Sequence, residues 1–239
     1  MMRKHLLKSV LTAFLITSAA AAQTQTPAET PAVEPAPETA PAEAVESAAP
    51  VDWTARAAEA YMATYRETCA PQDEADKLEL RKPDIHELKY RENSDEADQP
   101  DRMVSVYRFF CTRAAYNETH VYFIKNAFDE IQPLAFAEPA IHVVYENEDS
   151  EGKVLAIKII GLESHNQLVN SDIDPAKKAV TSFSKWRGVG DASSSGVWIF
   201  KDGSFVLSTF EVDASYDGEI NPKTVLDYRA ENEALSETP

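Results

Sequence analysis

The apolar and polar positions between residues 187 and 213 predict a β-hairpin. Val197, Ile199 and Lys201 alternate with Trp198 and Phe200, and every residue of this run except Lys201 is β-branched or aromatic. Such alternation over a short run is typical of a strand with two different faces. The run therefore predicts one strand of a sheet, preceded by a turn rich in Gly and Ser.

The two residues after this strand, Asp202-Gly203, are typical of a tight hairpin turn, because the central positions of such turns need positive φ. Alternation along the returning strand, 205–212, predicts two faces. One would hold Phe205, Leu207, Thr209 and Glu211, and the other Val206, Ser208, Phe210 and Val212. The hairpin carries no obvious catalytic group.

A single helix with an aromatic stripe is predicted near residue 53. Asp52 can cap its first turn, and Ala70-Pro71 would end it. Every fourth position belongs to one packing face: Trp53, Ala57, Tyr61, Tyr65 and Cys69.

Most of the remaining domain has the pattern of strands. The candidates are Lys77–Arg81, Ile85–Arg91, Met103–Cys111, Val121–Lys125, Ile131–Ala137, Ile141–Tyr145 and Val154–Ile160, the last two as a hairpin. The segment from Asp174 to Val180 fits either a helical turn or a loop. The sequence predicts a single α+β domain over residues 51–230, mostly antiparallel β with one N-terminal helix, and a frayed polar tail over residues 231–239.

The first 50 residues differ from this domain in composition. Basic residues, the apolar core Leu11–Ile16 and the small residues Ala20-Ala21-Ala22 predict a signal peptide over residues 1–22. Residues 23–50 are rich in Ala, Pro and Glu, include five glutamates and no basic residue, and predict a disordered linker. We therefore expect a periplasmic or secreted protein with no membrane span after signal cleavage.

The charge of the chain limits its partners. The full chain carries a formal net charge of −17, and removal of a leader with three positive charges would leave −20. Such a surface repels nucleic acid and anionic lipid headgroups. A basic protein remains a compatible partner, and the acidity also fits a simple role in solubility.

The chain has two cysteines, Cys69 and Cys111, and both lie in the predicted domain. In an exported protein an even pair favours a disulfide over free thiols. The bond would join the end of the helix to the strand Met103–Cys111. A catalytic thiol would need a nearby base, and the neighbouring sequence offers none.

No established catalytic or metal-binding motif is present, so the sequence predicts no catalytic residue, no metal site and no cofactor. The histidines of the domain lack the spacing of a zinc site: His86, His120, His142 and His165. The run Ser193–Gly196 lacks the glycine that opens a nucleophile elbow, and we interpret it as a flexible turn. We interpret the acidic segment Glu146–Gly152 as a solvated hairpin tip rather than a calcium site.

Arg187 and Asp191 flank a Gly-Val-Gly segment at the entry to the hairpin. They could bind a charged group of a partner, or hold the turn through a salt bridge and hydrogen bonds to backbone amides. The structural role is the interpretation that we favour. Trp186 and Trp198 are likewise interpreted as packing residues.

The segment from Asp174 to Gly203 resembles the C-terminal signature of an exported proteobacterial family catalogued as domain of unknown function 1176. The matching positions are Phe183, Arg187, Gly188, Gly190, Asp191, Trp198, Gly203, Phe205 and Leu207, and Thr224-Val225 with Arg229 resemble the family's ending. An upstream phrase, Cys followed closely by Ala-Tyr-Asn, is matched by Cys111 and Ala115-Tyr116-Asn117. The resemblance covers about residues 51–230, and it assigns no role to these positions.

The resemblance implies a periplasmic location, and the family has no known reaction to carry over. The family usually has Cys where this chain has Ala192, and a second Cys where this chain has 214–216. Loss of both positions together is expected for a bonded pair, because a single leftover thiol is a liability in an oxidising compartment. The resemblance implies that the chain keeps one family bridge, Cys69–Cys111, and lacks another.

A loose internal similarity leaves open a description of the domain as two related β lobes. Residues 115–136 and 190–210 each run in the order turn, aromatic strand, reversal, strand. Ordinary β alternation explains the same pattern.

Two functional hypotheses remain. The first is a non-enzymatic binding module whose partner is an unidentified envelope protein or glycan, or another exported protein. The second is a periplasmic hydrolase with a composite active site. A pocket with a His within hydrogen-bond reach of Ser or Asp would favour the hydrolase, and a shallow surface with an exposed aromatic or acidic patch would favour the binding module.

Overall fold

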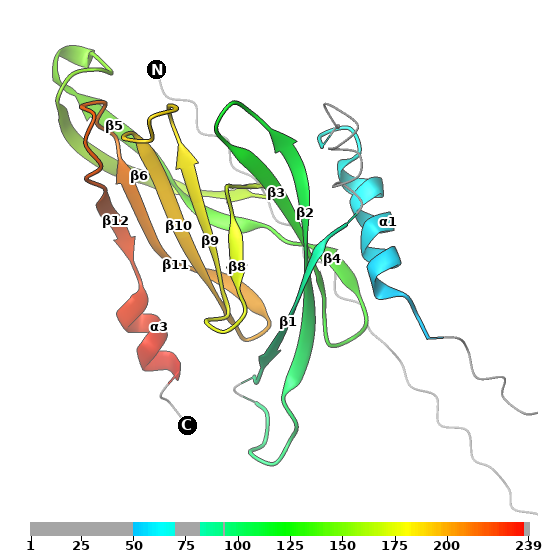
Figure 1. The fold of residues 1–239 in the computed structure, drawn as a ribbon. Helices are drawn as coiled ribbons and strands as arrows, with labels where there is room; N and C mark the ends of the chain where they lie inside the picture. The colour runs from blue at the N-terminus through cyan, green and yellow to red at the C-terminus, as the bar shows by residue number, and fades with distance from the viewer. Residues whose placement is uncertain (1–49, 70–81, 93, 237–239) are drawn as a thin grey trace, which may run out of the picture. The chain divides into compact units, whose positions relative to one another are not determined.

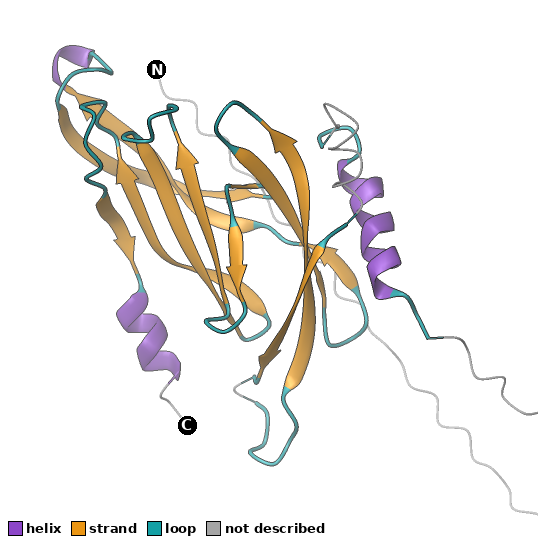
Figure 2. Ribbon diagram, in the orientation of Figure 1, coloured by secondary structure: helices purple, strands orange, loops and turns teal. Residues whose placement is uncertain are grey.

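The computed structural model describes residues 50–69, 82–92 and 94–236, which belong to one compact unit that begins at residue 49. The predicted signal peptide, the predicted linker up to residue 49 and the predicted strand Lys77–Arg81 lie outside the described residues. Figure 1 shows the order of the elements, and Figure 2 shows how strongly strands dominate.

The described elements follow the predicted fold class, an antiparallel β domain with one N-terminal helix. The helices are α1 (Trp53–Tyr65), the 3₁₀ turn η1 (Glu146–Glu148) and α3 (Arg229–Ser236). The strands are β1 (Asp84–Tyr90), β2 (Arg102–Arg113), β3 (Glu118–Lys125), β4 (Ile131–Pro133), β5 (Phe136–Tyr145), β6 (Val154–His165), β7 (Leu168–Val169), β8 (Asp172–Asp174), β9 (Ala179–Lys185), β10 (Ser193–Lys201), β11 (Ser204–Asp213) and β12 (Lys223–Asp227).

These strands form three sheets, and all pairings among the described residues are antiparallel. The first sheet has the order β1-β2-β3-β4, and β7 also pairs with β3. The second sheet has the order β12-β11-β10-β9-β8. The third is a long two-stranded ribbon of β5 and β6. Short connections between neighbouring strands explain why the pairing is antiparallel throughout.

The central strands of the first sheet, β2 and β3, are buried on both faces, because their side chains alternate between two cores. Val106 and Tyr122 point to the larger core, which also contains residues of the second sheet and of the ribbon. Phe109 and Phe123 point to a smaller core beneath α1. Figure 1 shows α1 lying against this first sheet. The near-continuous apolar runs of β2 and β3 follow from this double burial.

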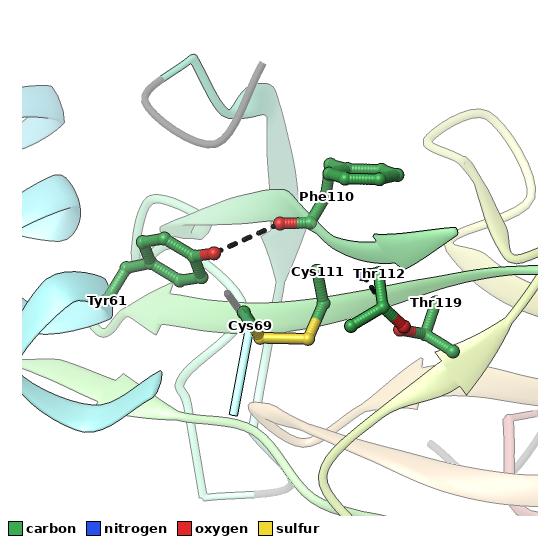
Figure 3. The surroundings of a disulfide bond; sticks show 6 residues. All are labelled: Tyr61, Cys69, Phe110, Cys111, Thr112 and Thr119. Carbon is green, nitrogen blue, oxygen red and sulfur yellow. Dashed lines mark hydrogen bonds between the residues drawn. A yellow bond between two sulfur atoms is a disulfide. The ribbon is translucent and has the colours of Figure 1, made fainter. Parts of the chain in front are cut away.

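Helix α1 begins as predicted, since the side chain of Asp52 accepts a hydrogen bond from the backbone N–H of Ala55 at 3.0 Å. The helix ends at Tyr65 rather than near residue 69, and Cys69 follows in a turn. Figure 3 shows the disulfide between Cys69 and Cys111 of β2. Beside it, the Tyr61 hydroxyl donates to the backbone carbonyl of Phe110 at 3.2 Å.

The hairpin of β10 and β11 has the predicted turn, with φ of 49° at Asp202 and 83° at Gly203. The predicted faces of β11 are wrong, because the register shifts: Val197 pairs with Thr209, and Trp198 pairs with Leu207. Residue 208 therefore has no opposite residue on β10 and forms a β-bulge. As a result Phe210 and Val212 share the core with Leu207.

The sequence and the structure also differ at two smaller points, and the structure decides between the alternatives that the sequence left open for residues 174–180. The serine run 193–195 is part of β10 rather than a flexible turn, and Ser193 is buried. Residues 175–178 form a turn before β9. Residues 229–236 form the helix α3, where a frayed tail was expected from residue 231.

The two segments compared as possible lobes lie in different sheets. Residues 121–123 belong to β3 of the first sheet, and residues 197–199 belong to β10 of the second. Strand β10 pairs with the strand that follows its reversal, β11, and β3 likewise pairs with β4, the short strand that follows its own reversal. Ordinary β-hairpins share this pairing, so descent from one duplicated lobe stays a hypothesis.

Candidate functional site

A polar cavity of about 400 Å³ is lined by residues of β1, β2 and β3, at the end of the first sheet where β2 turns into β3. Along β2 the core-facing positions change from Val106 to Arg108, and along β3 they change from Tyr122 to His120. Alternation thus continues past the apolar core and places an arginine and a histidine at its edge. Arg113 and Glu118 line the same cavity and pair at 2.8 Å.

Arg108 and His120 belong to one hydrogen-bonded network. The Nη2 atom of Arg108 lies 3.1 Å from Nε2 of His120, and Nδ1 of His120 lies 3.4 Å from Oγ of Ser171. The Tyr122 hydroxyl donates to the same Oγ at 2.8 Å. The Nη1 atom of Arg108 also lies 3.1 Å from a carboxylate oxygen of Asp172, so the network joins β2 and β3 to β8 and residue 171.

The arginine fixes the protonation of His120. A guanidinium group only donates hydrogen bonds, so Nε2 of His120 must accept, and the ring is neutral with its proton on Nδ1. Burial and, to a lesser extent, the positive charge of Arg108 together lower the pKa of His120 to about 4, against the opposing effect of Glu118, Asp84 and Asp172. Burial likewise raises the pKa of Tyr122 to about 12.

This geometry does not provide a serine nucleophile with a base. The distance between His120 and Ser171 meets the first criterion for a hydrolase, but the proton on Nδ1 points to Oγ, so this nitrogen cannot accept the serine proton. Ser171 is also buried, with 3% of its surface exposed. The network instead holds the two sheets together.

The signature residues Arg187 and Asp191 form a structural clasp. Arg187 donates from Nε to Oδ1 of Asp191 at 2.7 Å and from Nη2 to Oδ2, and Nη2 also donates to the backbone carbonyl of Tyr216 at 2.9 Å. Asp191 is fully buried and accepts a hydrogen bond from the backbone N–H of Gly218 at 2.9 Å. The guanidinium group of Arg187 holds the pKa of Asp191 well below its usual range. The clasp fixes the loop between β11 and β12 against residues 187–191.

The two family phrases, far apart in sequence, meet in space. The ring of Tyr116 lies over Gly188, where an added Cβ would be 3.5 Å away. The side-chain amide of Asn117 donates to the backbone carbonyl of Lys185 at 2.8 Å and accepts from its N–H at 3.2 Å. Asn170 donates to the side-chain oxygen of Asn117 at 2.8 Å. These contacts join the β2–β3 hairpin to β9.

The remaining signature residues have structural environments. Trp198 is fully buried and its indole N–H donates to the backbone carbonyl of Ala137 at 2.8 Å. Gly190 and Gly203 have φ of 80° and 83°, a region that favours glycine. The structure thus brings Arg187, Gly188, Gly190 and Asp191 into one contact region, residues 187–191, which we call the signature joint. It places Trp198 and Gly203 elsewhere on the hairpin.

The most exposed apolar segment of the described residues lies on β6. Leu155, Ile159, Ile160 and Leu162 are 56%, 43%, 70% and 64% exposed. Among the described residues β6 pairs only with β5, so its other edge presents unpaired backbone groups. We call this segment, residues 154–165, the β6 edge.

Sequence reasoning missed both the polar network and the β6 edge. Arg108 is the only charged residue within the apolar run 104–111, and this interruption was a usable signal. Ser171 gave no signal, because it meets His120 only through the pairing of β7 with β3. The β6 edge has the composition of a buried strand, and only the sheet topology shows that one side is uncovered.

The described part of the chain contains no cluster of three or more side chains that could hold a metal ion. Within the same residues, no helix has the length and apolar character needed to cross a membrane. The disulfide suggests an oxidising, extracytoplasmic location.

The fold defines the class of protein: an antiparallel β module with one helix, α1, packed on its first sheet, and with the signature joint at one end of the β10–β11 hairpin. Residues 17–218 match the family model described as "Protein of unknown function (DUF1176)", so the chain belongs to this family and the resemblance seen in the sequence is confirmed. Neither a curated protein nor a solved structure shows a significant match to the chain.

Proposed function

We propose that the chain is a non-enzymatic binding module of the periplasm, and that another exported protein binds along the β6 edge. The observation that carries this proposal is the long apolar strand β6, one side of which is unpaired among the described residues. Natural proteins usually protect such edges with charges, prolines or a covering element. Strand β6 has only Lys158 and Glu163 as charged residues between Val154 and Ser164.

The chemistry of this edge favours a protein over a glycan. An added strand from a partner would receive the free backbone hydrogen bonds of β6, and its side chains would cover the exposed leucines and isoleucines. The patch is aliphatic, so it is not the aromatic or acidic patch that was named above as favouring a binding module, and the proposal depends on the unpaired strand edge instead. A periplasmic location is part of the proposal, and the disulfide and the predicted signal peptide support it.

The experiment compares the mature chain, residues 23–239, with two matched variants as bait in a periplasmic extract. Ile160→Lys places a charge on the β6 edge at a side chain that is 70% exposed, so the fold should tolerate it. Val189→Lys makes the same change at a side chain that is 75% exposed but lies on the loop of the signature joint. Proteins retained on each bait are quantified by mass spectrometry.

We expect one protein that is retained by the wild type and by Val189→Lys, and at least about tenfold less by Ile160→Lys, since a lysine on the edge disfavours strand addition. Equal retention by Ile160→Lys would move the binding site off the β6 edge. Retention of a glycan alone, or of nothing, by the wild type would contradict a protein-binding module.

A further inference from the structure

A second cavity, of about 430 Å³, lies on the outer face of the second sheet, away from the β6 edge. Because side chains alternate along β10, Val197, Ile199 and Lys201 point away from the core that contains Trp198. Val197 and Ile199 form an apolar floor together with Ala179, which pairs with Ile199 across β9. Lys201 therefore lies at the end of this apolar floor.

The ammonium group of this lysine has no hydrogen-bond acceptor among the described residues. The Nζ atom of Lys201 is shielded from solvent, and no hydrogen-bond acceptor lies within reach among the described residues. The same is true of Nδ2 of Asn232 on α3, which lines the same cavity. A buried donor without an acceptor is costly, and a buried cation without a counter-charge more so. Two such donors at one cavity indicate that an acceptor is missing.

The charges around the cavity define that acceptor. Lys177 and Arg229 also line it, and each already pairs with a carboxylate, Asp174 at 3.0 Å and Asp227 through a bidentate contact. Among the side chains that the structure describes, none that lines the cavity is acidic, although the chain as a whole carries a net charge of −17. A locally cationic site in an acidic protein suits a small anion rather than a cation.

We propose that this cavity binds a small amphipathic carboxylate. The acyl chain lies over Val197 and Ile199, and the carboxylate accepts hydrogen bonds from Nζ of Lys201 and Nδ2 of Asn232. An apolar cavity of this size with a few convergent polar groups is typical of small-molecule sites. The site shares no residue with the β6 edge, so it does not depend on the proposed protein partner.

The test is calorimetric titration of the mature chain with decanoate, with decanol as the uncharged analogue. Lys201→Met keeps the length and apolar body of the side chain and removes the charge. Lys158→Met makes the same change on exposed β6, outside the cavity. Val197→Phe leaves Lys201 in place and narrows the apolar floor. Far-UV circular dichroism checks that each variant is folded.

We expect decanoate to bind the wild type and Lys158→Met equally, and about tenfold or more weakly to Lys201→Met, because a charge-assisted hydrogen bond is lost. Val197→Phe should also weaken the binding of decanoate. Decanol should bind the wild type and Lys201→Met with the same affinity. Equal affinity of decanoate for the wild type and for Lys201→Met would overturn the proposal, as would tighter binding of decanol than of decanoate. Absence of decanoate binding to the wild type at millimolar concentration would also overturn it.

Discussion

His120 shows how the fold sets the charge of one side chain. The sequence treated the histidines as metal-ligand candidates and found no fitting spacing. The structure gives His120 a different environment: 6% of its surface is exposed, and Arg108 donates to its Nε2 atom. No pattern along the chain reports this, because the two residues meet across a strand pair and with Ser171 of a third segment. The neutral charge state of the ring therefore depends on tertiary contacts.

This environment predicts a pH dependence of stability. The pKa of His120 is about 4 in the folded protein and about 6.5 when the chain is unfolded, so the unfolded chain takes up the proton first as the pH falls. The contribution of the neutral His120 ring to the free energy of unfolding is complete above about pH 6.5. It decreases by up to about 3 kcal/mol as the pH falls toward 4. Urea unfolding between pH 7 and pH 4 should show a smaller loss for His120→Gln than for the wild type.

The exposed His142 supplies the control for this experiment. His142→Gln removes one histidine without touching the network, so its loss of stability on acidification should match the wild type. If His120→Gln and His142→Gln gave the same pH profile, the assigned protonation of His120 would be wrong.

The elements were predicted better than their register. The pattern of β10 and the Asp202-Gly203 turn correctly predicted a hairpin, because local alternation and positive φ are local properties. The bulge at residue 208 was not predictable, since it depends on where Trp198 fits against β11. Gly196 illustrates the same dependence: an added Cβ would lie 2.4 Å from the ring of Trp198, so the indole occupies the space of a side chain.

The register of β10 and β11 predicts where the second disulfide of the family, which this chain lacks, would form. Ser193 pairs with Asp213, so one further step places Ala192 opposite Ala214, and both alanines are buried. Opposed residues in antiparallel strands have Cα atoms about 4.5–5.5 Å apart, which suits a disulfide. The double variant Ala192→Cys/Ala214→Cys should form this bond on export and gain about 3 kcal/mol in the chain-entropy estimate.

Mass analysis without reductant should find the double variant two hydrogens lighter than its reduced form. Each single variant should keep a free thiol and serves as the control for the stability measurement. Two free thiols in the exported double variant would show that the register does not extend past Ser193.

At the scale of the whole molecule, two hydrophobic cores share the first sheet. The larger core joins the two sheets, and the smaller one depends on α1. The sequence predicted the fold class and the single N-terminal helix because length, periodicity and turn residues report these directly. It gave no information on which sheet faces which, because that arrangement depends on contacts between segments distant in sequence. The candidate sites on β6 and β10 follow from this arrangement.

The disulfide belongs to the smaller core, which predicts an uneven loss of stability. Cys69 and Cys111 are 42 residues apart, so replacing both by Ala should cost about 4 kcal/mol in the chain-entropy estimate. The amides of α1 should then exchange with solvent at a lower free energy than those of β10, because only α1 loses its covalent link to the sheet. Native-state hydrogen exchange measures both, and the reduced wild type should behave as the double variant does. Equal loss of protection in α1 and β10 would contradict two separable cores.

The two sheets are fastened at opposite ends. At one end Tyr90 of β1 packs edge-on against Phe200, with ring centroids 5.5 Å apart, and covers the turn glycine of the β10–β11 hairpin. At the other end Asn117 bonds to the backbone of Lys185. A sandwich held at both ends has no axis about which it can open like a hinge. A partner of the kind proposed above would therefore meet the same rigid surface that the free protein presents, and binding would occupy this surface without changing its shape.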